Sequence, residues 1–149
     1  MSFSCRYVAL YVTALEAAEA FYRRVFEMDV LFRESLQDDG EWYTLRSELD
    51  WSEARELGVG IDMVALRRGD FVLALFPGEP SAGTVYEICV AVDAAELGAT
   101  RARLPENVVV EESSAGWLRF VDPFGFRWAV RDHTLLFRSS GELAGRWLG

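Results

Sequence analysis

The sequence contains no lysine, so all fifteen of its basic residues are arginine. Twenty-four acidic residues outnumber them, and the formal net charge is −9. Because an acidic protein repels phosphate backbones, nucleic acid is not expected as a partner. The excess negative charge would attract a cationic ligand, although the same charge can serve solubility alone.

Histidine and cysteine are almost as scarce. His133 is the single histidine and follows the last predicted strand, so we expect no His–His or Ser–His constellation within one chain. Cys5 and Cys89 do not make a disulfide framework and are too few for a zinc site. Both lie in apolar, strand-like sequence, where we expect buried thiols that behave as small hydrophobes.

Long apolar runs are also missing. None approaches the ~18 residues of a membrane span, and the N-terminus shows no charged leader before an apolar segment. We therefore expect a cytoplasmic protein with no membrane partner. A length of 149 residues with 51% hydrophobic residues fits a single globular domain, 1–149.

The sequence does contain an internal repeat. YVALYVTALEA (7–17) and EICVAVDAAEL (87–97) each join an alternating apolar strand to a helix start. Each carries a capping-box pattern, Thr13-x-x-Glu16 in the first and Asp93-x-x-Glu96 in the second. Apolar spacing predicts an amphipathic helix over about 14–27, and Pro105 ends the second helix.

Further strands complete both halves. DVLFRES and a hairpin over 61–76 follow the first helix, while NVVVEES and a hairpin over 117–131 follow the second. The second hairpin turns at Asp122-Pro123-Phe124-Gly125, a type I turn pattern. Each half therefore reads β-α-β-β-β, and the two modules span about 5–76 and 84–131.

Two segments fall outside the repeat. The insertion 38–59 contains the capping box Asp50-x-x-Glu53, which predicts a short helix. Its tryptophans, Trp42 and Trp51, either face a ligand or anchor that helix to the domain. The C-terminal tail 134–149 is predicted to add another helix, with Leu143 and Trp147 on one face.

Two such modules, the run VALYVTALEAAEAFYRRVF and the closing FVDPFGFRWAV resemble the vicinal oxygen chelate superfamily. That group includes glyoxalase I, extradiol dioxygenases, fosfomycin-resistance enzymes and bleomycin-resistance proteins. The resemblance implies an α+β fold in which curled mixed sheets surround a concave pocket and the helices cover the outer face. It also implies a homodimer.

The resemblance implies that the metal site of the superfamily is mostly lost. In its metalloenzymes the ligands come from the first and last strands of each module, and those positions hold Tyr7, Ala74, Glu87 and Ala129. A first-row metal needs about three suitable ligands, and this set offers one carboxylate. We therefore expect no metal and no cofactor.

Strand alternation, taken alone, divides the residues between two faces. One face is heavily apolar and suits a helix-covered core. The other mixes small, aromatic and charged residues, a composition typical of a ligand pocket. This second face comprises Tyr7, Ala9, Tyr11, Val72, Ala74, Phe76, Glu87, Cys89, Ala91, Arg127, Ala129 and Arg131.

The predicted ligand-binding residues are Tyr7, Tyr11, Phe76, Glu87 and Arg127. Three interpretations of Glu87 stay open. It contacts the ligand, it forms an inert ion pair with Arg127 or Arg131, or it acts as a catalytic base beside a tyrosine. As a base, Glu87 would need a second polar partner such as Tyr7 or Tyr11 to make an acid/base pair.

The sequence therefore favours a metal-independent small-molecule-binding protein that resembles the bleomycin-resistance proteins. Aromatic residues, an inward carboxylate and net acidity suit a planar or cationic ligand. The alternative is a glyoxalase- or dioxygenase-like enzyme, a lyase, isomerase or oxygenase, with an atypical site. A third hypothesis is a module that serves only oligomer or partner contacts.

Overall fold

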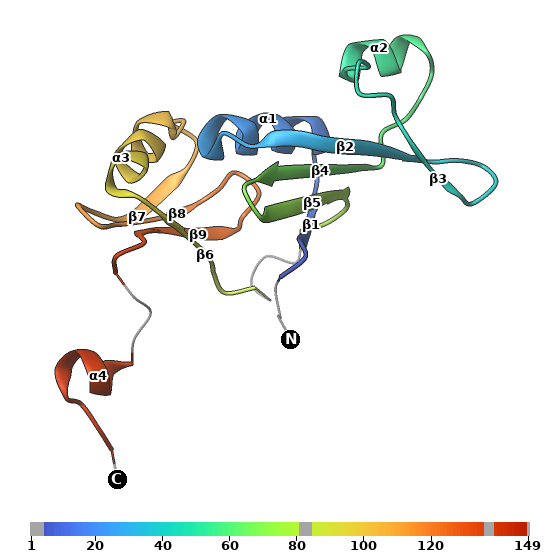
Figure 1. Cartoon of the computed structure of the whole chain (residues 1–149). Coiled ribbons are helices and arrows are strands. Elements are labelled where there is room, and N and C mark those ends of the chain that lie inside the picture. The colour runs from blue at the N-terminus through green and yellow to red at the C-terminus, as the bar shows by residue number, and fades with distance from the viewer. Residues whose placement is uncertain (1–4, 81–84, 136–138, 149) are drawn as a thin grey trace. The chain divides into compact units, whose positions relative to one another are not determined.

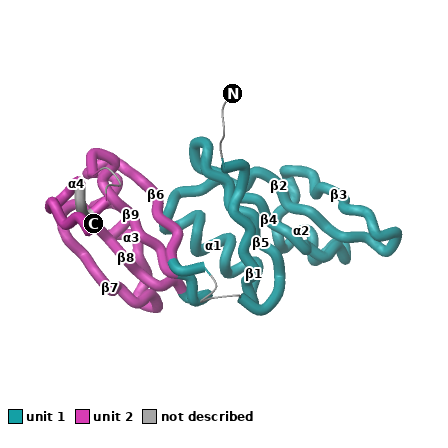
Figure 2. Tube along the Cα trace, turned by 90° about the horizontal axis from the view of Figure 1, so that it is seen from below, with its two compact units in different colours: residues 1–86, 123–126 teal, residues 87–122, 127–149 magenta. Residues whose placement is uncertain are grey.

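The computed structural model describes residues 5–80, 85–135 and 139–148. The chain forms two compact units, shown in different colours in Figure 2. Unit 1 comprises Met1–Tyr86 together with Pro123–Phe126, and unit 2 comprises Glu87–Asp122 and Arg127–Gly149.

Unit 1 contains a five-stranded mixed sheet in the order β1-β5-β4-β2-β3. β1 runs parallel to β5, and the other neighbours are antiparallel. Figure 1 shows helix α1 lying along this sheet. In chain order the elements are β1 (Val8–Val12), α1 (Leu15–Phe26), β2 (Asp29–Leu36), β3 (Trp42–Thr44), α2 (Trp51–Glu56), β4 (Met63–Arg68) and β5 (Phe71–Pro77).

Unit 2 repeats the plan with a four-stranded sheet in the order β6-β9-β8-β7, in which β6 is parallel to β9. Its elements are β6 (Ile88–Val92), α3 (Ala94–Arg103), β7 (Val109–Ser114), β8 (Trp117–Val121), β9 (Arg127–Asp132) and α4 (Ser140–Ala144). Apart from β3, α2 and α4, both units read β-α-β-β-β. The predicted α+β class with two mixed sheets is confirmed.

In each unit one face of the sheet is covered by a helix. The side chains that fill these two cores come from alternate strand positions, as period-2 alternation predicts. In unit 1 they include Leu10, Val12, Val64, Leu66, Leu73 and Leu75 beneath Ala18, Tyr22 and Val25 of α1. In unit 2 they include Leu118, Phe120, Trp128 and Val130 beneath Leu97 of α3. The buried indole Nε1 of Trp128 donates to Asp122, 2.8 Å away.

The helix caps confirm part of the prediction. Asp50 and Glu53 form the complete capping box of α2, and Asp93 accepts from the Glu96 amide at the start of α3. The predicted box at Thr13 is wrong. α1 begins at Leu15 with Ala14 as its N-cap and no side-chain cap, so Glu16 lies one position too early to close a box.

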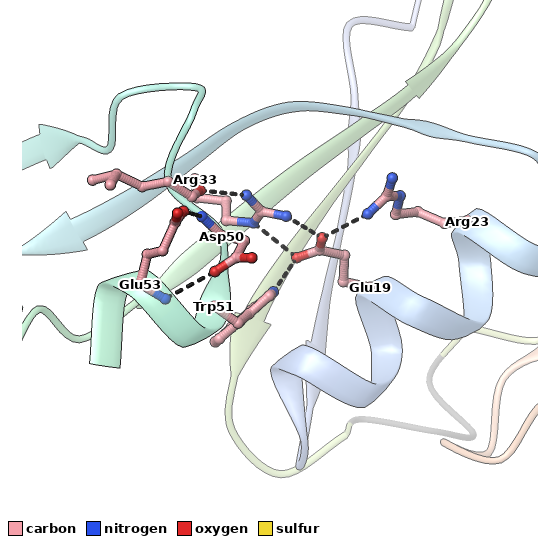
Figure 3. Close-up of polar contacts among 7 residues, drawn as sticks. Glu19, Arg23, Arg33, Asp50, Trp51 and Glu53 are labelled. Atoms are coloured by element: carbon pink, nitrogen blue, oxygen red, sulfur yellow. Dashed lines mark hydrogen bonds and ion pairs between the residues drawn. The ribbon is translucent and has the colours of Figure 1, made fainter. Parts of the chain in front are cut away.

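The insertion adds strand β3 to the edge of the unit 1 sheet and anchors α2 through a buried carboxylate. Glu19 of α1 is 2% exposed. Its carboxylate accepts from Arg33 Nε at 3.0 Å and from Trp51 Nε1 at 2.5 Å, and Arg23 completes the group at 3.5 Å (Figure 3). Of the two interpretations of Trp51, the anchor is therefore the one confirmed.

The turn at Asp122–Gly125 joins β8 to β9 as predicted, with Gly125 at a φ of 91°. Within unit 1 the ring of Phe124 lies 6.0 Å from that of Phe21 and 6.1 Å from that of Tyr22, both on α1. The turn therefore also supplies an aromatic side chain to the packing of unit 1.

The two thiols lie on the surface. Cys5 and Cys89 are exposed, so the prediction of buried thiols is wrong. The tail contains a helix, α4, but it ends at Ala144, so Trp147 cannot share a helical face with Leu143. Among the described residues, no helix is both long and apolar enough to cross a membrane.

Candidate ligand-binding faces

The face of the unit 1 sheet opposite α1 has small residues at its centre. Ala74 of β5 lies between Ala9 of β1 and Ala65 of β4, all in register. Register partners point to the same side of a sheet, so the side chains that project from the middle of this face are short. Tyr11 and Phe76 form the next register pair on this face of the same strands, with ring centroids 6.4 Å apart.

A third aromatic ring reaches this pair from the opposite edge of the sheet. Trp42 lies on β3, which β4 and β2 separate from β5, yet its ring centroid is 6.3 Å from that of Phe76. The sheet must therefore curl to bring its edge over Phe76. Trp42 is 46% exposed and Tyr11 is 55% exposed. We call Tyr11, Trp42 and Phe76 the aromatic group.

A carboxylate shares the face of the aromatic group. Glu34 of β2 is the register partner of Met63 on β4 and of Thr44 on β3, and Thr44 is two residues from Trp42. Glu34 is half-buried and accepts a hydrogen bond from Thr44 Oγ1 at 3.2 Å. Within the described residues it has no basic partner, so its negative charge is uncompensated.

Sequence reasoning did not find Glu34. A β-bulge between Val30 and Phe32 shifts the register of β2, so alternation counted from the start of this strand assigns the wrong face. In the structure the neighbouring Arg33 shows which face Glu34 takes. Its side chain bonds Glu19 on the α1 side of the sheet, so Glu34 must point to the opposite side.

The structure distributes the five predicted ligand-binding residues between the two units. Tyr11 and Phe76 lie together in unit 1, where Tyr7 is exposed just before β1. Glu87 and Arg127 lie in unit 2. Arg127 donates from Nε and Nη2 to Glu111, at 2.6 and 3.1 Å.

Glu87 has a partner that the sequence analysis did not consider. Arg119 of β8 donates from Nε to Glu87 Oε2 at 2.6 Å and from Nη1 to Glu112 Oε1 at 2.9 Å. Both members of the Glu87–Arg119 pair are largely buried. The alternation of Trp117, Arg119 and Val121 in WLRFV was the signal that could have placed Arg119 on this face.

The uncovered face of unit 2, opposite α3, is therefore rich in arginine. Arg119 lies in register with Ala129 of β9, and Ala129 lies in register with Cys89 of β6. Desolvation raises the pKa of the Cys89 thiol, and the negative charge of Glu87 raises that pKa further. Beside them Trp117 lies next to two guanidinium groups, whose central carbons are 4.7 Å (Arg119) and 4.5 Å (Arg131) from its ring centroid.

A separate cavity of about 510 Å³ lies between the end of β2 and the insertion, which includes β3. Its polar lining includes Asp38, Asp39 and Tyr43. The Tyr43 hydroxyl donates to Asp39 at 2.7 Å, which lowers the pKa of Asp39 and raises that of Tyr43. None of the five predicted residues lines this cavity.

Residues 5–130 match the model of the Glyoxalase/Bleomycin resistance protein/Dioxygenase superfamily. The chain belongs to this superfamily. No curated protein matches the sequence.

Solved structures of superfamily proteins have the same fold at low identity. The fosfomycin resistance protein FosX from Listeria monocytogenes is 13% identical with a TM-score of 0.65, over 99% of this chain and 100% of that one. FosX from Mesorhizobium loti is 18% identical, TM-score 0.64, over 98% and 100%. Lactoylglutathione lyase from Agrobacterium tumefaciens is 22% identical, TM-score 0.56, over 91% and 97%. At these identities the likeness shows the fold alone.

The residues present do not fit the metal of the superfamily's metalloenzymes. Of the four positions that the resemblance assigned to ligands, Ala74 and Ala129 carry no donor atom and are buried. Tyr7 is an exposed phenol, and Glu87 is held by the Arg119 guanidinium. Among the described residues, no three His, Cys, Asp or Glu side chains gather closely enough to hold a metal ion.

Proposed function

We propose that this superfamily member binds a small planar cation without a metal ion, on the uncovered face of unit 1. The observation that carries the proposal is the aromatic group, half-exposed on the same face as Glu34, which has no basic partner among the described residues. Aromatic rings offer apolar area and a negative π-face, and a cation within about 6 Å of a ring centroid is attracted to it.

Glu34 supplies the charge selectivity in this proposal. Among the described residues, the half-buried Glu34 carboxylate accepts only from the Thr44 hydroxyl, so a ligand cation near it would offset part of the cost of its partial burial. Of the three alanines only Ala9 on β1 is exposed, so we propose that a flat molecule lies at that end of the row, beside Tyr11.

The Glu87–Arg119 pair supports metal independence. An arginine stays protonated at all working pH values, so its guanidinium places a permanent positive charge beside Glu87, where a divalent cation would be repelled. We propose that Glu87 is thereby committed to this pair. Glu34, rather than Glu87, then selects for a positively charged ligand.

Tryptophan fluorescence titrations with N-methylquinolinium and with neutral quinoline test this function. Wild type should bind the cation more tightly, and Glu34→Gln should reduce that preference by roughly 0.5–2 kcal/mol. Trp42→Ala should weaken both compounds because it removes the ring. Glu87→Gln and the tail variant Trp147→Ala, matched in chemistry, should leave both affinities unchanged.

Equal affinities of wild type for the charged and the neutral compound would refute the proposed selectivity. Glu87→Gln could instead weaken binding of the cation more than Glu34→Gln does. That result would favour the binding residues predicted from the sequence over the site formed by the aromatic group and Glu34.

A further inference from the structure

We infer that Arg131 and Trp117 form an oxyanion-binding site on the uncovered face of unit 2, which takes the carboxylate or phosphate group of a small molecule. This site lies on a different sheet from the aromatic group and selects the opposite charge. It does not rest on the function proposed above.

The two side chains are fixed beside each other by the sheet. Trp117 on β8 and Arg131 on β9 are register partners, and the Arg131 guanidinium carbon lies 4.5 Å from the Trp117 ring centroid. The indole Nε1 of Trp117 donates to Glu112, which holds the ring in place. A guanidinium held against an aromatic ring loses little further freedom when it binds a ligand.

Arg131 differs from the other two arginines of this face in having no carboxylate. Arg119 bonds Glu87 and Glu112, and Arg127 bonds Glu111. Arg131 has neither an ion pair nor a hydrogen bond within the part of the chain that the structure describes, and its Nε is buried without an acceptor.

The donors that remain determine what could bind. Because Nε is the buried, unpartnered nitrogen, the two terminal nitrogens of Arg131 form the accessible end of the group. They carry N–H groups in a planar fork and cannot lose their charge, so only an acceptor can satisfy them. Paired oxygens of a carboxylate or phosphate match that fork in two parallel hydrogen bonds.

The overall charge makes this local arrangement selective. A chain with a net charge of −9 repels anions at long range, so an anion binds only where an uncompensated cation is presented at contact distance. Arg131 is such a cation, and its position beside Trp117 favours an oxyanion carried on an aromatic or other flat group.

Calorimetric and fluorescence titrations with benzoate, its neutral analogue benzamide and inorganic phosphate test the inference. Wild type should bind benzoate at least tenfold more tightly than benzamide. Comparable binding of phosphate would indicate a site for free oxyanions, whereas weaker phosphate binding would indicate an organic carboxylate. Equal affinities for benzoate and benzamide, or no binding of any oxyanion, would overturn the inference without any mutant.

Variants locate the site. Arg131→Gln should weaken benzoate at least tenfold, and Arg131→Lys, which keeps the charge but loses the fork, should lie between it and wild type. Arg101→Gln removes the same charge from α3 of the same unit, where Arg101 bonds Ser113, and should change benzoate affinity less than twofold. Equal losses of benzoate affinity in Arg101→Gln and Arg131→Gln would mean that the change in net charge alone causes the loss. That result would refute the site.

The same variants separate this inference from the proposed function. N-methylquinolinium affinity should be the same in Arg131→Gln as in wild type. Failure of the cation titrations with success of the benzoate titrations would remove the proposed function and leave the oxyanion site standing. The converse result would remove the oxyanion site alone. Circular dichroism of each variant, with Arg131→Lys as the milder change, confirms that the loss concerns binding rather than folding.

Discussion

Units 1 and 2 share one backbone plan but differ in what their uncovered faces carry. In both, the first strand runs parallel to the last and a single helix covers the core side. The face in unit 1 carries aromatic rings and the Glu34 carboxylate, which has no basic partner in the described part of the chain. The face in unit 2 carries arginines, most of them paired with glutamates. Repetition of a fold has therefore not repeated its chemistry, because the core constrains only alternate strand positions.

The units also differ in how their helices are held. Unit 1 has a buried ionic group around Glu19 that joins α1, β2 and α2. The corresponding ion pair in unit 2 joins Glu96 and Arg103 within α3 alone, and both side chains are more exposed than Glu19. Stability in unit 1 should thus depend more strongly on one carboxylate.

The largest expected effect is that of Glu19→Ala. It leaves Arg33 and the Trp51 indole without their acceptor in a buried position, so unfolding should require about 3–5 kcal/mol less free energy. Glu96→Ala is the matched change in unit 2 and should cost about 1 kcal/mol. Urea unfolding of both variants measures the difference. Equal losses would mean that the two units are held with equal strength.

Arg119→Met should have a moderate effect. It leaves Glu87, which is largely buried, and Glu112 without their cation, at a cost of about 1–3 kcal/mol. The control is Arg55→Met, which breaks the well-exposed Arg55–Glu16 pair in unit 1 and should change the stability little. Thermal melts of both proteins provide the comparison. If the melting temperature falls no further in Arg119→Met than in Arg55→Met, the Glu87–Arg119 pair contributes no more to stability than an exposed ion pair.

A smaller effect is expected at the Cys89 thiol. Desolvation and the charge of Glu87 both raise its pKa, so Glu87→Gln removes one of these causes and should lower that pKa. More thiolate would then be present at any pH below the pKa, and alkylation by iodoacetamide should become severalfold faster. Cys5, exposed in unit 1, serves as the internal control and should react at an unchanged rate. Mass spectrometry of the two peptides gives both rates.

The smallest expected effect is that of a chelator. Because Ala74 and Ala129 provide no donor and Arg119 holds Glu87, treatment with EDTA should leave the melting temperature of the whole chain unchanged. Elemental analysis of the purified protein should find no stoichiometric transition metal. About one metal ion per chain would contradict this prediction.

Much of the fold could be predicted because local patterns determined it. The repeated strand-to-helix run and strict alternation placed Leu73 and Leu75, and Trp128 and Val130, on the core faces where they lie. The first capping box was misplaced because a single-residue change in where α1 begins moves Glu16 from N3 to N2, and a sequence pattern alone does not determine that start.

The candidate sites were less predictable because they depend on contacts between strands. Alternation tells which face Glu87 takes but not which arginine of a neighbouring strand will reach it, and the partner came from β8. Trp42 could not be assigned to Phe76 because their contact depends on the curl of a sheet in which two strands separate them. The burial predicted for Cys89 failed because that residue lies on the uncovered face.

The position of Phe124 limits where the chain can be divided into fragments that fold on their own. Phe124 is encoded after most of unit 2, yet its ring packs on Phe21 and Tyr22 of α1. A fragment that ends at Tyr86 would retain every strand of the first sheet and still lack this ring, so it would expose apolar surface on α1. The halves of this duplicated chain are consequently not interchangeable parts. During synthesis, unit 1 can complete its packing only after the chain has been extended through residues 87–122 of unit 2 to Phe124.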